Sequence, residues 1–184
     1  MNAVFLSLRR GVFLIGCLMM FFVPASPAET AQHEFVGVKK CSMCHKKPER
    51  GDQYGIWLKS KHAKAFETLG TPEAKEAGAK RGVTDPQTSG KCLKCHSTAY
   101  GFSEAEVTDA IPVEEGVSCE SCHGPGKDYM KKSVMEDQSA AIANGLVIPK
   151  EETCKKCHNE ESPNFKPFNF KDRWEQIKHP VPKK

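Results

Sequence analysis

Aliphatic and aromatic residues are scarce in this chain of 184 residues. Aromatic residues make up 8% of it, and 14 glycines and 12 prolines interrupt long regular elements. A small domain with so few core residues cannot rely on hydrophobic burial alone, and depends on disulfides, metals or cofactors. We therefore predict that another component supplies much of the interior.

A strong excess of one charge is also missing. Lys and Arg total 27 and Asp and Glu total 23, so the formal net charge is +4. Such a weak excess does not indicate nucleic-acid binding. No nucleophile with a base and no phosphate-binding loop stands out. The pairs Lys39–Lys40 and Lys46–Lys47 form either a solvated face or a docking patch.

The chain has no long apolar run. Its most apolar stretch, residues 12–23, is shorter than the roughly 20 residues of a membrane-spanning helix. Arg9 and Arg10 precede this stretch and PASPA follows it, which is typical of a secretory signal peptide cleaved after Ala28. We predict a signal peptide over 1–28, a domain over 29–184 and a periplasmic or extracellular location. A retained anchor and lipidation at Cys17 are the alternatives.

Cysteine, in contrast, is abundant and regularly spaced. Removal of 1–28 leaves eight cysteines, all within the units CSMCH, CLKCH, CESCH and CKKCH. Four disulfides or two four-thiolate zinc sites would use these thiols but would not explain a histidine after every pair. Covalent haem attachment explains both, because the thiols bind the porphyrin and the histidine ligates the iron.

The sequence thus predicts four c-type haems. The attaching residues are Cys41, Cys44, Cys92, Cys95, Cys119, Cys122, Cys154 and Cys157, and the proximal iron ligands are His45, His96, His123 and His158. The predicted domain provides 39 residues for each haem. Because so few residues cannot enclose each haem separately, the haems are expected to pack together and form the core.

Three other histidines, His33, His62 and His179, are candidate distal ligands, too few for four irons. We predict a helix from a cap at Asp52 to Gly70. Its apolar face would hold Leu58, His62, Phe66 and Leu69. A second short helix is expected to start at Thr71 and run towards Gly82.

His179 follows a predicted helix that Asp172 caps and that packs Trp174 and Ile177, and Pro180 ends it. His33 lies close to the predicted new N-terminus, where exposure is the expectation. It could still reach the first haem or a neighbouring molecule. Met130 and Met135 are either packing residues or thioether ligands.

Five stretches resemble the tetrahaem cytochrome c-554 family. They are VGVKKCSMCH, SKHAKAF, CLKCH, GVSCESCHGPG and CKKCH, in this order, over most of residues 36–158. Its best-known members take electrons from hydroxylamine oxidoreductase in ammonia-oxidising bacteria. The resemblance implies a mainly helical, loop-rich fold with long loops around closely stacked haem pairs, and redox proteins as partners.

The resemblance also implies a set of distal ligands. His62 would cap the third haem, bound at Cys119 and Cys122, and His179 would cap the fourth, while the second would stay five-coordinate. This family has a histidine shortly after Gly-Pro-Gly for the first haem, but KDYMKKSVM has none. Met135 is then the leading candidate for that position and His33 the second.

These observations predict an exported electron carrier. The first alternative is a haem enzyme that reduces a small nitrogen oxide or peroxide at an open second haem, for which Asp52, Tyr54 and Tyr100 are candidate proton donors. The second is a subunit of a haem wire or of a membrane redox complex, in which His33 would ligate a neighbouring molecule.

Overall fold

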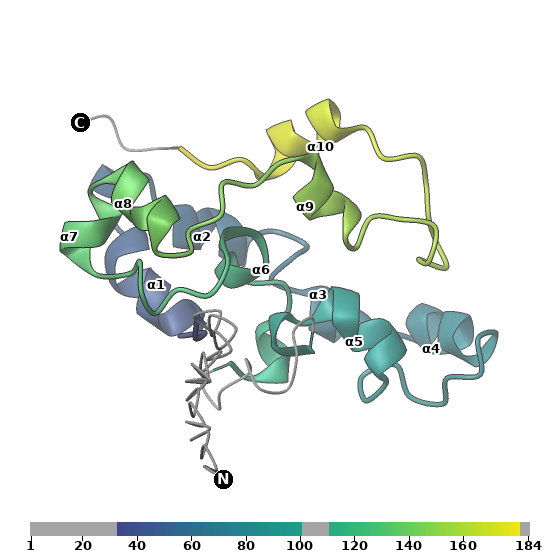
Figure 1. Ribbon diagram of the computed structural model, residues 1–184. Coiled ribbons are helices and arrows are strands. Elements are labelled where there is room, and N and C mark those ends of the chain that lie inside the picture. Colours follow the sequence, from purple (N-terminus) through teal and green to yellow (C-terminus); the bar gives the residue numbers. More distant parts are fainter. Residues whose placement is uncertain (1–32, 101–110, 181–184) are drawn as a thin grey trace, which may run out of the picture. The chain divides into compact units, whose positions relative to one another are not determined.

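A computed structural model describes residues 33–100 and 111–180 of the chain (Figure 1). Regular structure within these two ranges is entirely helical, without a strand, which confirms the mainly helical fold. The predicted signal peptide and Cys17 lie outside the described residues. No helix in the described ranges is long and apolar enough to cross a membrane.

The helices are short, at most eight residues each in the described part of the chain. The α-helices are α1 (Val38–His45), α2 (Gln53–Leu58), α3 (Ala65–Thr68), α4 (Pro72–Ala79), α5 (Gly90–His96), α6 (Cys119–His123), α7 (Lys132–Met135), α8 (Gln138–Ala143), α9 (Glu151–Lys155) and α10 (Phe170–Ile177). The 3₁₀ turns are η1 (Pro48–Arg50), η2 (Thr98–Tyr100) and η3 (Val113–Glu115). Helices of this length are not stable alone, so contacts between distant segments must hold them.

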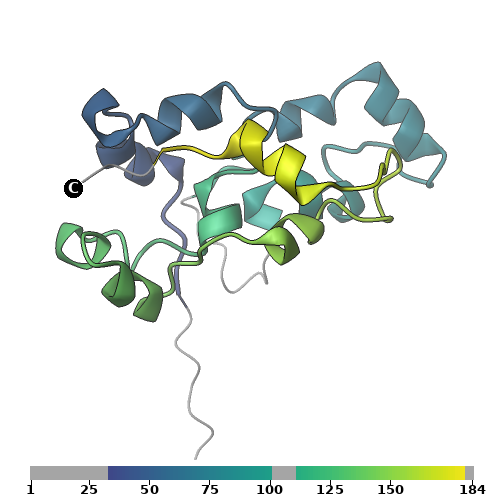
Figure 2. The same cartoon turned by 90° about the horizontal axis from the view of Figure 1, so that it is seen from above.

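Several of these helices pack against partners far away in the sequence. Helix α1 contacts both α2 and α6, and α3 contacts both α5 and η3. Both views show α7 beside α8 (Figures 1 and 2). The packing therefore brings the segments around the first and third CxxCH units together.

The predicted continuous helix over 52–70 is wrong. Asp52 does cap its start, since its carboxylate accepts the Gly55 N–H over 3.1 Å, but α2 ends at Leu58 and α3 begins only at Ala65. His62 lies in the turn between them. Its carbonyl accepts the Ala65 N–H in a local turn and also the Val117 N–H, each over 3.1 Å, and the second contact ties the turn to the segment before the third unit.

The predicted apolar face is interrupted as well, because Leu58 is 51% exposed whereas Leu69 is 4% exposed. The next helix agrees with expectation: Thr71 caps α4 through the Ala74 N–H, and Gly82, in a left-handed conformation, follows its end. At α10 the cap is Asn169, which accepts the Asp172 N–H, and not Asp172 itself.

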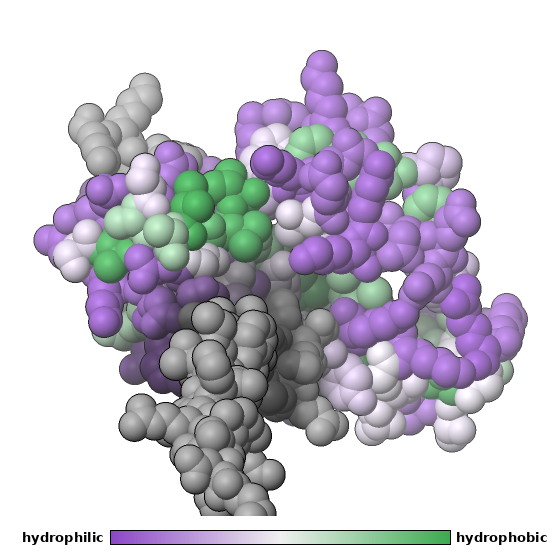
Figure 3. Space-filling view, viewed as in Figure 1, coloured by the Kyte–Doolittle hydropathy of each residue, from purple (hydrophilic) through white to green (hydrophobic). Residues whose placement is uncertain are grey.

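The protein interior contains few large apolar side chains. Its most buried residues include Phe35, Leu69 and Leu93, but also the polar Thr98 and Glu120, which are each 1% exposed. Apolar side chains also gather on the surface over the end of α8 and the chain after it (Figure 3), where Ile142 is 49% exposed. So small a number of buried apolar side chains is what the composition predicts.

Candidate functional site

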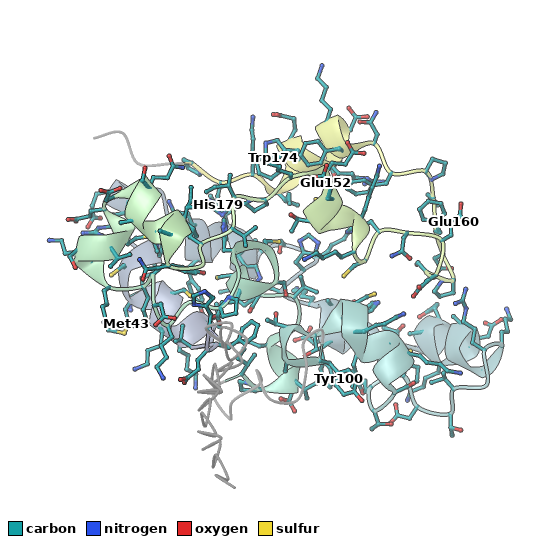
Figure 4. The ribbon with its side chains drawn as sticks, in the orientation of Figure 1. Met43, Tyr100, Glu152, Glu160, Trp174 and His179 are labelled. Atoms are coloured by element: carbon teal, nitrogen blue, oxygen red, sulfur yellow. The ribbon has the colours of Figure 1, made fainter. Side chains whose placement is uncertain are left out.

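The four CxxCH units lie on short helices or directly at a helix end. Helices α1, α5 and α6 each end on the histidine of their unit, and α9 contains the first cysteine of the fourth unit. Residues three apart on a helix share a face, so the two thiols of a unit are presented together and the histidine follows one residue later. Met43, between the thiols of the first unit, points outward and is 62% exposed (Figure 4).

The state of the unit cysteines can be read directly within the described residues. All eight unit cysteines are free thiols. No group of three or more His, Cys, Asp or Glu side chains within the described ranges is arranged to hold a metal ion. Neither a disulfide framework nor a zinc site is formed there.

Three of the four unit histidines make a hydrogen bond through Nδ1. His45 faces the Gln53 amide oxygen at 3.2 Å, His96 the Ala65 carbonyl at 2.8 Å, and His123 the Val147 carbonyl at 3.1 Å. A proton on Nδ1 leaves the Nε2 lone pair free, which is the usual state of an iron-ligating imidazole. These residues therefore fit the proximal side of a covalently attached haem.

Two further histidines, His62 and His179, each have a ring close to the ring of a unit histidine. The rings of His62 and His158 have centroids 6.1 Å apart, and those of His123 and His179 have centroids 5.9 Å apart. Two imidazoles on opposite sides of one metal ion, each at the roughly 2 Å of a metal–imidazole bond, bring their ring centres to roughly 6 Å. Both pairs thus have the spacing of two axial ligands of one iron.

These pairs exchange the partners that the resemblance implied. His62 was expected with the third unit and His179 with the fourth, but the structure places His62 against His158 of the fourth unit and His179 against His123 of the third. Sequence order gave no means of choosing, because both candidates are far from either unit along the chain.

The electrostatics of the site favour neutral imidazoles. Burial, and secondarily the nearby His158, lowers the pKa of His62. Burial also lowers the pKa of His123, although its bond to the Val147 carbonyl opposes this shift. Partial burial, and then charge repulsion from His123 and His45, lowers the pKa of His179. Because only a neutral imidazole can bind iron, these shifts suit ligation.

The remaining distal candidates are placed differently. His33 is not free: its Nδ1 lies 2.7 Å from the Asp128 carboxylate, and its ring packs over Gly145. Met135 is half-buried at the end of α7. Among the described residues, no second histidine ring contacts the ring of His45 or of His96.

The thiols show which units are neighbours. Cys41 and Cys119 approach within hydrogen-bonding reach, which raises the pKa of Cys41 and lowers that of Cys119. The same relation between Cys95 and Cys157 lowers the pKa of Cys95 to about 7. We call the first and third units the first–third pair, and the second and fourth units the second–fourth pair. Within each pair, the attachment points lie side by side.

Two carboxylates anchor the first–third pair. Glu120, between the cysteines of the third unit, accepts the N–H groups of Val36, Gly37 and Gly126 over 2.6 to 3.0 Å. Glu115 accepts the N–H of Val38, the first residue of α1. The sequence alone did not identify either residue, because nothing in their local sequence reveals that their partners are backbone groups far away.

The Gly-Pro-Gly turn after the third unit is explained by close contacts. Gly124 has a φ of +76°, and a Cβ there would lie 2.9 Å from the Gly145 carbonyl oxygen. A Cβ on Gly126 would lie 3.0 Å from Glu120 Oε1. Only glycine combines the left-handed conformation of Gly124 with such an approach. The turn thus admits both the chain after α8 and the anchoring carboxylate.

Comparison with known proteins gives one consistent family. The family model of cytochrome c554 and c-prime matches residues 40–124. Cytochrome c-554 of Nitrosomonas europaea is 31% identical over 159 residues, which are 84% of this chain and 61% of the relative's length. The solved structure of the reduced state of cytochrome c554 from Nitrosomonas europaea matches with a TM-score of 0.53 and 28% identity, over 79% of each chain.

Proposed function

Because the chain belongs to the cytochrome c554 family, we propose that it is an exported c-type cytochrome that holds four haems and passes electrons between redox proteins. The single observation that carries this proposal is the pairing of the four units. One thiol of each unit lies within hydrogen-bonding reach of a thiol of a second unit, and three of the four unit histidines have Nδ1 engaged.

The chain itself attaches, orients and encloses the cofactor. The eight unit cysteines would form the thioether links, and the four unit histidines would be the proximal ligands. When bound, haem supplies one-electron uptake and release, and the protein adjusts its potential through the axial ligands and their hydrogen bonds. Four attachment sites in so short a chain keep the distances between neighbouring haems small.

We assign the distal ligands from the ring pairs. His179 would complete the iron site of His123, and His62 that of His158. For the first haem, Met135 remains the leading candidate and His33 the second. The contact of His33 Nδ1 with Asp128 would leave its Nε2 free for iron. No distal ligand is assigned to the second haem.

Redox proteins are the proposed partners, one as electron donor and one as acceptor. Lys39, Lys40, Lys46 and Lys47 are exposed at the two ends of α1, next to the first unit. Exposed lysines around a haem site would favour a partner with an acidic face, because complementary charges accelerate encounter. The proposed location is the periplasm or the cell exterior.

A second candidate function is reduction of a small nitrogen oxide or peroxide at the second haem. One observation favours it: no second histidine ring contacts His96 among the described residues. Tyr100 packs close to Gly90 at the start of α5, which carries this unit, and is one candidate proton donor.

Low-temperature electron paramagnetic resonance of the oxidised, haem-loaded protein tests both candidates. A high-spin signal from about one haem in four would support an open second site and justify turnover assays. Four low-spin haems would support a pure electron carrier and would make Met135 or His33 an obligatory ligand. Fewer than four covalently bound haems, counted by intact mass, would contradict the proposed function.

A further inference from the structure

We infer that the Gln53 side chain is a positioning residue that joins the proximal ligand of the first haem to the chain segment carrying the distal ligand of the third. This inference rests on the proposed function. Gln53 is the first residue of α2, and although polar it is only 9% exposed. No haem-attachment motif includes it.

Every polar group of the Gln53 amide is used. Its oxygen lies 3.2 Å from His45 Nδ1, and its nitrogen donates to the carbonyls of Arg50 and, over 2.8 Å, Pro180. An amide has two N–H donors. Since both point at carbonyls, only the oxygen is left for the histidine.

This arrangement fixes the tautomer of His45. An amide oxygen only accepts, so His45 must donate from Nδ1, and its Nε2 lone pair remains available for iron. The strength of this hydrogen bond also determines how electron-rich the imidazole is, and therefore the potential of the iron that it binds.

The other end of the amide holds the C-terminal segment. Pro180 directly follows His179, whose ring lies 5.9 Å from that of His123. The neighbouring Gly51 has a φ of +97°, and a Cβ there would lie 3.1 Å from the Pro180 carbonyl oxygen and 3.3 Å from its Cγ. The segment after α10 is thus seated closely on Gly51 and Gln53.

The Gln53 side chain therefore contacts both His45, the proximal ligand of the first haem, and the segment that carries His179. Loss of the Pro180 contact frees the segment that presents His179, and loss of the His45 contact changes the proximal histidine of the first haem. A residue that served only the packing of α2 would affect neither iron in a specific way.

Two substitutions separate the two contacts. Gln53→Leu removes both, whereas Gln53→Glu keeps an acceptor for His45 and loses the donors to Pro180 and Arg50. We expect both variants to lose the low-spin signal of one haem in four, the same signal that His179→Ala removes. Only Gln53→Glu should shift the first haem to a lower potential, because a carboxylate accepts more strongly than an amide.

The Nδ1 proton of His45 provides a readout that is independent of turnover. In hyperfine-shifted NMR of the oxidised holoprotein, this proton should exchange with solvent faster in Gln53→Leu but not in Gln53→Glu. Gln138→Leu is the matched control, since Gln138 is the first residue of α8 and is exposed. It should leave both the spin state and the exchange rate unchanged.

Wild-type spectra in Gln53→Leu, or an effect on only one of the two haems, would overturn the coupling. If Gln53→Leu binds no haem, Gln53→Glu decides, because retention of the His179-dependent low-spin signal in that variant would contradict the role of the Pro180 contact. Failure of the proposed function is distinguishable, because the wild-type protein itself would then lack four haems or the His179-dependent signal.

Discussion

The two unit pairs are held together by contacts of opposite kinds. In the first–third pair, Glu120 is 1% exposed and accepts three backbone N–H groups from two other segments. In the second–fourth pair, an ion pair joins Lys94 and Glu161, whose side chains are 47% and 66% exposed. Arg81 adds a bond to the Glu161 carbonyl over 2.6 Å, also at the surface.

This difference bears on what the polypeptide specifies by itself. A buried acceptor that satisfies buried donors is costly to remove, because the donors stay unpaired away from water. An exposed ion pair competes with water and is screened by salt. The polypeptide therefore fixes the first–third arrangement strongly, while the second–fourth arrangement depends more on packing between the haems that the two units would each hold.

The largest effect is expected from Glu120→Ala. The change leaves the N–H groups of Val36, Gly37 and Gly126 without their acceptor. We expect the free energy of unfolding to fall by about 3 to 5 kcal/mol, or haem attachment at the first and third units to fail. Urea unfolding followed by haem absorbance measures this. Glu114→Ala, at a nearby exposed position, is the control and should be neutral.

A smaller effect is expected from Thr98→Val, at the junction between the second and third units. The Thr98 hydroxyl donates to the Gly116 carbonyl and accepts the buried Ser118 N–H over 2.8 Å. Valine keeps the shape but leaves that N–H unpaired, so stability should fall by about 1 to 3 kcal/mol. If Thr98→Val had the same free energy of unfolding as the wild type, the Thr98 hydroxyl would not be what holds this junction.

The sequence was sufficient for whatever depends on local spacing. The four CxxCH units predicted which histidine lies beside each thiol pair, and Thr71 marked the start of α4, because such signals act within one helical turn. The helix over 52–70 was wrong for the opposite reason. The carbonyl of His62 also accepts the Val117 N–H, and no periodicity within the segment contains that information.

The same limit explains the missed anchors. Gln53 reaches Pro180 across 127 residues, and Glu120 reaches Val36 across 84. Their side chains bind backbone groups of these distant segments. Because every residue has a backbone, no particular residue type in the sequence marks the partner. The ring neighbours of His62 and His179 differ from those that the resemblance implied for the same reason, because they also depend on contacts between distant segments.

The stability of the first–third pair should also depend on pH through Glu115. Burial raises the pKa of Glu115 above its ordinary value near 4.5, although the Val38 N–H and other contacts oppose this. The folded state therefore prefers the protonated acid, and stability falls as pH rises from about 4.5 through the raised pKa. Glu115→Gln keeps an acceptor for Val38 and removes this dependence.

We thus expect Glu115→Gln to raise the urea midpoint at pH 7 relative to the wild type, and to have less effect at pH 4. Titration of other groups is shared by both proteins and cancels in the difference between their midpoints. An advantage of the variant that is equal at both pH values would mean that the Glu115 carboxyl does not titrate differently on folding.

The smallest effect is expected from Lys94→Ala in the second–fourth pair. The ion pair with Glu161 lowers the pKa of that carboxyl, but both groups are exposed, so its contribution to folding is small and disappears at high salt. The urea midpoint should match that of Lys91→Ala, an exposed position one helical turn earlier on α5. A loss comparable to that of Thr98→Val, persisting in 1 M salt, would mean that the second–fourth pair is held by the polypeptide after all. The haems would then not be needed to bring those two units together. The two unit pairs would no longer differ in how strongly the polypeptide holds them.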